Sequence, residues 1–230
     1  MVTWIMRTTP REVFISLKAN FNLNNVQQAV LIGTLLGDGT IQMRKKDARL
    51  HIKHSLNQIS LVEYKRKVFA NITNMNVRVF KQKVGGVDYN FAEFVTLTHS
   101  EFTRFYKLFY KEHKKVVPTD LGQLLKSPMS VAVWIMDDGS SEYAGVSIQT
   151  HSFTEEEVKN LIKVIENNFN LKALMRKNKN RWIIYFTKSS LFKLTRLVSK
   201  YTLPEFEYKL KPYSLRPRRD CTPGPDTIGI

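Results

Sequence analysis

Two short apolar stretches dominate the hydrophobic pattern of this chain, and each ends in an Asp-Gly pair. They cover residues 30–39 and 131–139, and their last acids, Asp38 and Asp138, lie 100 positions apart (138 − 38 = 100). A helix that is apolar on almost every side is expected to be buried. Each carboxylate nevertheless falls at the helix C-terminus, where the helix dipole disfavours negative charge. An unfavourable arrangement that occurs twice indicates that the two acids act together.

The residues after each apolar stretch alternate between helical and strand-like periods in the same order. The first apolar helix, starting at Asn24 or Asn25, is followed by predicted strands at 40–44, 49–53, 77–83 and 91–98 and by helices at 57–71 and 100–110. After the second stretch, the pattern predicts strands ending at 150, 177 and 186, and helices that begin after Thr154 and near Ser189 or Ser190. The order αββαββα therefore occurs twice. It predicts an α+β fold of tandem halves related by a pseudo-twofold axis, with antiparallel sheets and helices on one face.

This repeat also sets the expected domain boundaries. We expect residues 1–111 to form the N-terminal half and residues 128–215 the C-terminal half. The segment 112–127 starts with lysines and contains Pro118 and Gly122, which suits a linker between the halves. Residues 216–230 are rich in Pro and Gly at their centre and are expected to form a flexible tail.

The charge of the chain points to a polyanionic partner. Lys and Arg number 36 against 20 Asp and Glu, which gives a formal net charge of +16 and a pI near 9.9. Because basic side chains that contact phosphate supply most non-specific affinity for nucleic acids, a nucleic acid is favoured over a membrane surface. The single cysteine, Cys221, supports neither an internal disulfide nor a structural zinc site. We expect a soluble intracellular protein, with an organelle (mitochondrion or chloroplast) and a prokaryotic cytoplasm both left open.

The paired motifs resemble those of the LAGLIDADG homing endonucleases. Residues 128–140 (PMSVAVWIMDDGS) are similar to the single-chain branch with two motifs, and the resemblance extends from about Val30 to Pro212. It implies that the two motif helices pack together between saddle-shaped sheets and that their acids meet beside the DNA minor groove. It also implies a monomer that cuts both strands of a long double-stranded DNA target in a staggered way, and this target need not be a palindrome.

Two carboxylates held close together repel each other unless a cation lies between them. Hard oxygen ligands suit Mg²⁺, with Mn²⁺ as a substitute. The candidate metal ligands are Asp38 and Asp138, with Gly37 and Asp137 as further candidates. Small residues allow helices to approach closely, and Gly33 and Gly37 lie on one helix face in the first motif. Val133 and Asp137 take these places in the second motif, which predicts looser or offset packing there.

A lysine near a proline ends each half. Lys115 lies 77 positions after Asp38 (115 − 38 = 77), and Lys209 lies 71 positions after Asp138 (209 − 138 = 71). The resemblance implies that a lysine at each place approaches the active centre. There it could orient the attacking water or stabilise the developing phosphorane charge. Lys115 and Lys209 are the candidate catalytic lysines, with Lys114 and Lys211 as alternatives.

DNA recognition is expected on the sheet faces that lie opposite the helices. Arginine suits guanine edges and glutamine suits adenine edges in the major groove, whereas lysine more often contacts phosphate. The candidates from the first half are Gln42, Arg44, Arg49, His51, Lys53, Lys81 and Lys83, and Gln82 is a secondary candidate. Those from the second half are Ser147, Gln149, His151, Lys172, Arg176 and Arg181.

Other features have simpler interpretations. The basic run at residues 65–67 is expected to be a solvated helix face, and the five histidines lack the spacing of a metal site. The leading functional hypothesis is a Mg²⁺-dependent, intron-encoded DNA endonuclease. The alternative is an RNA maturase that assists splicing of its own intron on the same scaffold, so that intron RNA would be a further partner. A DNA-binding regulator is a third class, but it would not need two intact acidic motifs.

Overall fold

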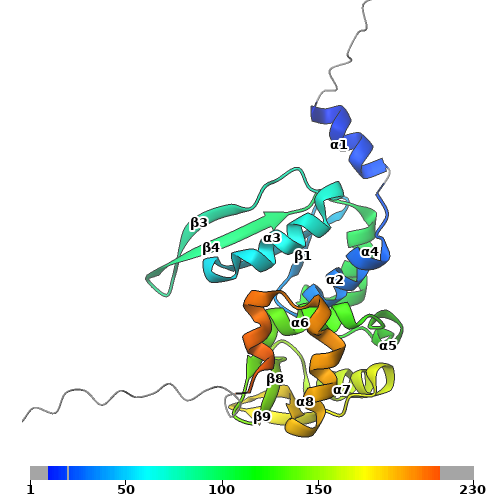
Figure 1. Cartoon of the computed structure of the whole chain (residues 1–230). Helices are drawn as coiled ribbons and strands as arrows, with labels where there is room; N and C mark the ends of the chain where they lie inside the picture. Colours follow the sequence, from blue (N-terminus) through cyan, green and yellow to red (C-terminus); the bar gives the residue numbers. More distant parts are fainter. Residues whose placement is uncertain (1–9, 20, 213–230) are drawn as a thin grey trace, which may run out of the picture.

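The computed structural model describes residues 10–19 and 21–212. The expected tail at 216–230, Cys221 and the last residues of the C-terminal half therefore lie outside the described residues. Helix α1 (Pro10–Ala19) precedes two similar layered halves, one above the other in Figure 1. Within the described ranges, no helix is long and apolar enough to cross a membrane.

The N-terminal half contains one four-stranded antiparallel sheet in the order β1-β2-β4-β3. Its elements are α2 (Asn25–Leu36), β1 (Thr40–Met43), β2 (Ala48–Ser55), α3 (Ile59–Val68), β3 (Arg78–Val84), β4 (Val87–Val95) and α4 (Ser100–Phe109). Short 3₁₀ turns at Leu56–Gln58 and Ala70–Ile72 flank α3. In Figure 1 the β3–β4 hairpin extends well beyond the other strands.

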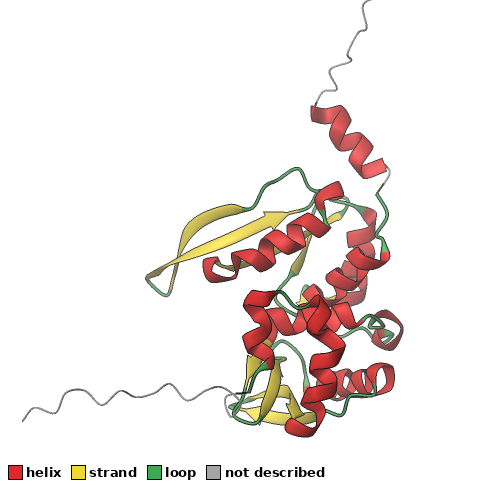
Figure 2. Cartoon of the chain, in the orientation of Figure 1, coloured by secondary structure: helices red, strands yellow, loops and turns green. Residues whose placement is uncertain are grey.

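The C-terminal half repeats this order, with a second sheet arranged β7-β8-β10-β9. Its elements are α6 (Pro128–Asp138), β7 (Gly139–Ser141), β8 (Gly145–Gln149), α7 (Glu155–Phe169), β9 (Leu174–Asn178), β10 (Arg181–Thr187) and α8 (Lys188–Val198), followed by 3₁₀ turns at Ser199–Tyr201 and Pro204–Leu210. The predicted α+β architecture with two αββαββα units is confirmed, and the helices cover one face of each sheet (Figure 2).

The segment 112–127, which we expect to link the halves, contains regular secondary structure. It holds the second strand of a small two-stranded sheet, β5 (Tyr110–Lys111) paired with β6 (Lys114–Lys115), and the short helix α5 (Leu121–Leu124). The turn of this hairpin places Glu112 and His113 in the left-handed backbone region, with φ of 49° and 63°. The hairpin fixes the position of Lys115 where the chain passes out of the N-terminal half.

The helix starts follow from local side-chain chemistry. Asn24 accepts a hydrogen bond from the Gln27 backbone, and the Gln27 side chain returns to Asn24, which completes a capping box. Thr154 and Glu157 form the capping box predicted from the sequence at the start of α7. Ser127 caps α6, and Pro128 occupies its first turn, where no backbone N–H is needed.

The two motif helices, α2 and α6, pack against each other at the centre of the molecule. They are buried along almost their whole length, as the apolar pattern predicts. A Cβ atom on Gly33 would lie 2.3 Å from the Ser130 carbonyl oxygen and 2.8 Å from the Val133 Cβ. Only a residue without a side chain fits there, so Gly33 sets how closely the two halves approach. The acids at the helix ends are positioned by this contact.

Candidate active site

Asp38 and Asp138 lie together at the base of the motif helices. Asp138 is the last residue of α6, and Asp38 follows the Gly37 that ends α2. Both carboxylates line one cavity of about 160 Å³. The remaining lining residues are Leu36, Gly37, Gln149, Thr150, His151, Ser152 and Phe153. The fold therefore brings together two acids that are 100 positions apart in sequence.

The two acids have unequal environments. The Asp38 side chain is 49% exposed. Burial, together with the negative charges of Asp38 and Asp137, raises the pKa of Asp138 to about 8 against the opposing effect of Lys115 and Lys209. Like charges that share a site disfavour each other's ionisation unless a cation is present. The protein alone therefore does not stabilise both carboxylates in their charged form.

Lys115 and Lys209 hold the ends of the two motif helices. The Lys115 Nζ donates to the carbonyl oxygens of Gly37 (2.7 Å) and Gly39 (2.9 Å). The Lys209 Nζ donates to those of Met136 (2.6 Å) and Asp137 (2.8 Å). Burial lowers the pKa of both lysines, and the three nearby aspartates oppose that shift. An ammonium has three donors, so two of them fix the backbone and one remains for a ligand.

The alternative lysines lie elsewhere. Lys114 is exposed, and the Lys211 Nζ is 3.1 Å from the Glu207 carboxylate on the surface. Of the two pairs that the sequence left open, Lys115 and Lys209 are therefore the ones beside the acids. Their catalytic role stays a prediction.

Asp137 has a different position from its neighbour. Both of its carboxylate oxygens accept hydrogen bonds from the Lys65 Nζ, at 2.6 and 2.8 Å, and both side chains are fully buried. The expectation that Lys65 lies on a solvated helix face is wrong, because its side chain crosses to the other half. Since its oxygens are engaged by Lys65, Asp137 is a poor candidate for direct metal binding. The Gly37 carbonyl keeps one lone pair beyond its bond from Lys115.

Most of the metal-binding groups at the cavity are oxygens, with the His151 imidazole at its rim. The described part of the chain contains no group of three or more His, Cys, Asp and Glu side chains placed to hold a metal. Two carboxylates with backbone carbonyls suit a hard cation such as Mg²⁺, which usually binds one or two carboxylates and keeps several waters. The residues present therefore fit the expected cation.

The N-terminal sheet presents an interlinked polar face on the side away from the helices. The Gln42 Oε1 accepts from the Arg49 Nε (3.0 Å) and Nη2 (2.9 Å), and the Gln42 Nε2 is 2.8 Å from the His51 Nδ1. The His51 Nε2 in turn lies 3.1 Å from Glu93. Arg44 follows the end of β1 and also reaches Gln42, at 3.4 Å. These predicted DNA-binding side chains therefore form one network on one face.

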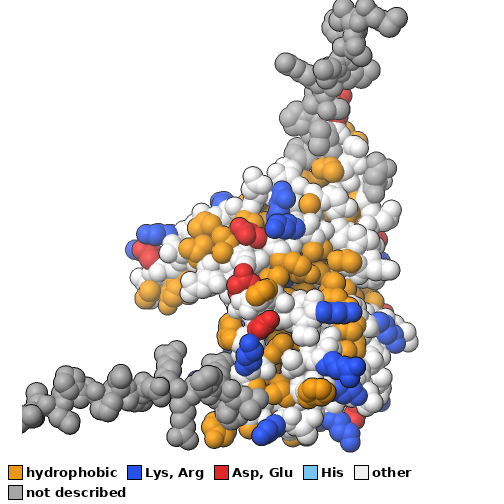
Figure 3. Space-filling view, viewed as in Figure 1, with side chains coloured by type: hydrophobic (Ala, Val, Ile, Leu, Met, Phe, Trp, Pro, Cys, Tyr) orange, Lys and Arg blue, Asp and Glu red, His pale blue; other side chains and the backbone are white. Residues whose placement is uncertain are grey.

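Strand register corrects part of the predicted surface. Lys53 pairs with Glu93, which pairs with Arg78, so these side chains share the face away from the helices. Lys81 and Lys83 alternate with Arg78 and point to the opposite face of the β3–β4 hairpin, so the expectation that they share the sheet face of Lys53 is wrong. Gln82 takes that place and accepts a hydrogen bond from Lys53. Figure 3 shows basic, acidic and hydrophobic side chains together at the hairpin tip.

The C-terminal sheet places most of its predicted residues on one face. Ser147 and Gln149 of β8 share this face with Arg176 of β9 and Arg181 of β10. The Arg176 guanidinium stacks on the Tyr185 ring, 3.3 Å from its centre. Lys172 is exposed just before β9 and lies outside the paired strands, and His151 follows β8 at the rim of the acidic cavity. The Gln149 Oε1 is buried without a hydrogen-bond partner in the described structure.

His54 and Lys65 are the site residues that sequence reasoning missed. The His54 Nδ1 is 3.6 Å from the Asp38 carboxylate, and its Nε2 is 3.6 Å from that of Asp137. Both residues occur at apolar positions of a periodic pattern: His54 continues the buried alternation of Leu50 and Ile52. A polar residue at a core position was the available signal.

Comparisons with known proteins agree with this geometry. The profile of the LAGLIDADG DNA endonuclease family matches residues 28–194. The chain is 30% identical over 204 residues to the cytochrome b mRNA maturase bI2 of Debaryomyces hansenii, covering 84% of this chain and 78% of the relative. It is 28% identical over 197 residues to the probable intron-encoded endonuclease 1 of Wickerhamomyces canadensis, covering 82% and 85%.

A solved structure shows the same arrangement. The homing endonuclease I-WcaI bound to its DNA recognition sequence superposes with a TM-score of 0.82 at 27% identity, over 90% of this chain and 96% of that one. The structure of I-DmoI in complex with DNA and Mn shares the fold at 12% identity, with a TM-score of 0.52. With two acidic motif helices between two antiparallel sheets and a family match over most of its length, the chain belongs to the LAGLIDADG DNA endonuclease family.

Proposed function

We propose that this protein is a site-specific homing endonuclease that makes a staggered double-strand break in a long, non-palindromic DNA target by Mg²⁺-dependent hydrolysis. One observation carries the proposal: two acids from the two halves line a single cavity at the base of the motif helices, in a fold whose two sheets have polar and basic faces. Family membership and the likeness to a DNA-bound homing endonuclease support the same activity. The relatives named as intron-encoded support an origin within an intron.

The residues of this chain have separable tasks in that reaction. Asp38 and Asp138 would hold the divalent cations, with Mn²⁺ as a substitute, and the Gly37 carbonyl is a further donor at the same place. Bound Mg²⁺ would supply Lewis acidity and lower the pKa of water. Lys115 and Lys209 fix the backbone that carries the acids and leave one ammonium donor each for a phosphate oxygen.

The two sheets would read adjacent half-sites. The N-terminal face offers the linked Gln42, Arg49 and His51, whereas the C-terminal face offers Arg176 on Tyr185 and Arg181 on the neighbouring strand. Because the faces differ, the preferred half-sites would differ, and the target need not be palindromic. Since one chain supplies both acids, we propose that a monomer is sufficient.

Cleavage of a randomised duplex library in Mg²⁺, with sequencing of the cut ends, tests the proposal. Metal ions contribute several kcal/mol of transition-state stabilisation, so Asp38→Asn and Asp138→Asn should each slow cleavage by about 10⁴-fold. Asp120→Asn, at an exposed acid outside the cavity, is the matched control and should cut as the wild type does. Absence of specific cut sites, or full cleavage by both cavity variants, would refute it.

The maturase alternative is favoured by a specific relative. The cytochrome b mRNA maturase bI2 of Debaryomyces hansenii matches most of this chain. If assisting the splicing of intron RNA is the main activity here, that activity should survive Asp38→Asn and Asp138→Asn, because RNA binding does not need the paired acids. Splicing of the intron that encodes the chain, compared between wild type and these variants, separates the two functions.

A further inference from the structure

A fully buried ion pair joins the two halves beside the acidic cavity. Lys65 comes from α3 of the N-terminal half, and Asp137 comes from the end of α6 in the C-terminal half. The Lys65 Nζ lies 2.6 and 2.8 Å from the two carboxylate oxygens, and neither side chain is exposed. Burying two charges is costly, and such pairs often contribute little net stability. A role beyond stability is therefore worth seeking.

This pair is connected to Asp38 by two routes. His54, buried on β2, places its Nε2 3.6 Å from the Asp137 carboxylate and its Nδ1 3.6 Å from that of Asp38. The Asp137 carboxylate also lies directly on the backbone before Asp38, because a Cβ on Gly37 would be 2.6 Å from its Oδ2. Asp137 thus contacts the backbone that carries the catalytic acid of the other half.

Neither residue of the Lys65–Asp137 pair is repeated at the equivalent position of the other half. The offset of 100 that relates the acids also relates Leu61 and Lys65 of α3 and its C-cap Phe69 to Leu161, Ile165 and Phe169 of α7, and all six are buried. The counterpart of Lys65 is therefore Ile165 (165 − 65 = 100), and the counterpart of Asp137 is Gly37 (137 − 37 = 100). Both positions thus carry a charged residue where the other half has an uncharged one, and the two charged side chains lie within hydrogen-bond distance. This indicates that they act together.

The other side of the site has no equivalent. Gly37 has no side chain that could lie on the backbone of Asp138, and Ile165 has no charge to hold one. Lys65 also neutralises a third carboxylate beside Asp38 and Asp138, which would otherwise compete for a cation. Asp38 is consequently held by the partner half, whereas Asp138 is not held in this way.

We propose that Lys65 is a positioning residue that acts through Asp137 and His54 on Asp38, and that this one-sided support makes the two DNA strands break at unequal rates. The inference rests on the proposed endonuclease function. It assigns to a buried cation, on the covered side of the N-terminal sheet, an effect on which DNA strand breaks first.

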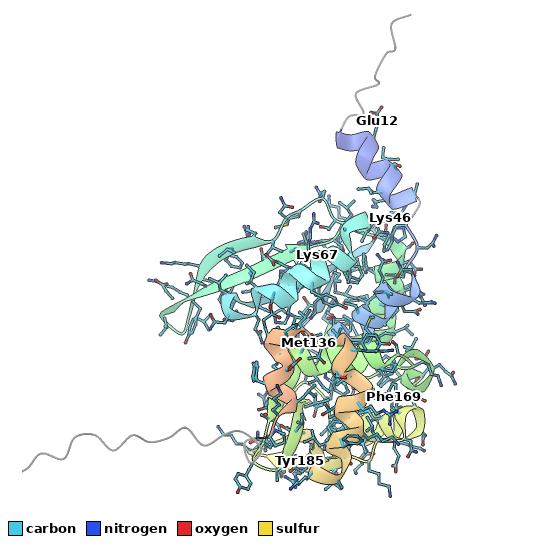
Figure 4. The ribbon with its side chains drawn as sticks, viewed as in Figure 1. Glu12, Lys46, Lys67, Met136, Phe169 and Tyr185 are labelled. Atoms are coloured by element: carbon cyan, nitrogen blue, oxygen red, sulfur yellow. The ribbon has the colours of Figure 1, made fainter. Side chains whose placement is uncertain are left out.

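The experiment replaces each residue by its symmetry counterpart. The variants are Lys65→Ile, Asp137→Gly and the double variant, in which no uncompensated charge stays buried. Lys67→Met, on the exposed side of the same helix (Figure 4), removes the same charge without touching the site and serves as the control. Thermal unfolding and target binding without divalent cation establish that each variant folds and binds. Single-turnover cleavage of a duplex labelled on both strands then gives the rate for each strand.

The double variant should fold and bind the target within about threefold of the wild type, yet change the ratio of the two strand rates by about tenfold or more, because small misplacements of a catalytic group are costly. Lys67→Met should leave that ratio unchanged. An unchanged ratio in the double variant, or an equal slowing of both strands, would overturn the inference and leave the pair a structural link. If the wild type cuts no duplex at all, it is the proposed function that fails, and the inference fails with it.

Discussion

The two halves of this protein share a plan but differ in the residues that pack their motif helices together. At the helix contact, the first motif supplies Gly33 and Gly37, while the second supplies Val133 and Asp137 against them. The Asp38 side chain is half exposed, whereas burial shifts the pKa of Asp138 to about 8. The acids and the lysines are duplicated, but the packing residues are complementary. A duplicated site can therefore keep the same catalytic residues in both copies, while the contact between the halves requires different packing residues in each copy.

The two sheets also differ, in the length of their outer hairpins. Strands β3 and β4 have seven and nine residues, whereas their counterparts β9 and β10 have five and seven. The longer hairpin extends the N-terminal surface beyond the core, so the two halves offer DNA surfaces of different reach.

Breaking the buried pair at the interface should have the largest effect on stability. Lys65→Met leaves the Asp137 carboxylate buried without its cation, which costs about 3–5 kcal/mol of unfolding free energy. Adding Asp137→Gly should recover most of that loss, because no charge is then left unpaired. Chemical denaturation of both single variants and the double variant measures the coupling, with Lys67→Met as the control. Additive losses would show that the two side chains do not interact.

The glycine contact offers a second, smaller test of the asymmetry. Gly33→Ala places a methyl group 2.3 Å from the Ser130 carbonyl oxygen, so the motif helices must separate, at about 1–3 kcal/mol. Gly122→Ala in α5 is the matched control, because its new Cβ would meet only Val164, at 3.8 Å. Thermal unfolding should show a lower Tm for the first variant and no loss for the second.

The strand register separates two classes of basic residue. Arg49→Ala removes a side chain from the linked face and should weaken target binding by about 1–3 kcal/mol, with relaxed preference at the N-terminal half-site. Lys81→Ala lies on the other face of the hairpin and should change affinity by less than about threefold. Binding titrations with base-substituted duplexes check both. A larger loss for Lys81→Ala would mean that the DNA follows the other face.

A further test of the difference between the halves is a pH dependence that belongs to one acid. The unfolded chain releases the Asp138 proton near its ordinary pKa of 3.8, whereas the metal-free native state retains it until about pH 8. The native state therefore binds more protons between these values, and the free energy of unfolding should fall as pH rises from about 4 to about 8. Asp138→Asn should remove that slope. Denaturation without divalent cations at several pH values measures it, and adding Mg²⁺ should offset the loss.

Much of the fold was accessible from the sequence, because it rests on local signals. The apolar runs before Asp38 and Asp138, the capping box at Thr154 and the alternation around His51 each specify their own element. The apolar Leu171 continues the pattern of the strand predicted to end at 177, but that strand begins only at Leu174, since Leu171 is buried by packing rather than by pairing. Such a boundary depends on tertiary contacts that periodicity does not contain.

The site was less accessible, because its contacts cross between halves. The resemblance to a known family implied a lysine beside each acid, and Lys115 and Lys209 matched those places by position. Nothing local distinguishes Lys65 from the half-buried Arg66 and the exposed Lys67 except its place on the apolar side of the helix. Its partner is 72 positions away. For Lys81, two-residue periodicity predicted that it lies on the same face as Lys83. Which face of the sheet that is depends on the pairing of β3 with β4, which the sequence does not show.

The Gln42 side chain also bears on how a target preference can drift over generations. Its amide is engaged by Arg49 and His51 at once, and His51 continues to Glu93. A substitution at any one of these positions frees hydrogen-bonding groups on the others, so the contacts of this face with several base pairs would change together. New targets in this half should therefore arise through linked groups of changes, whereas a lone substitution would more often blur the old preference than create a new one.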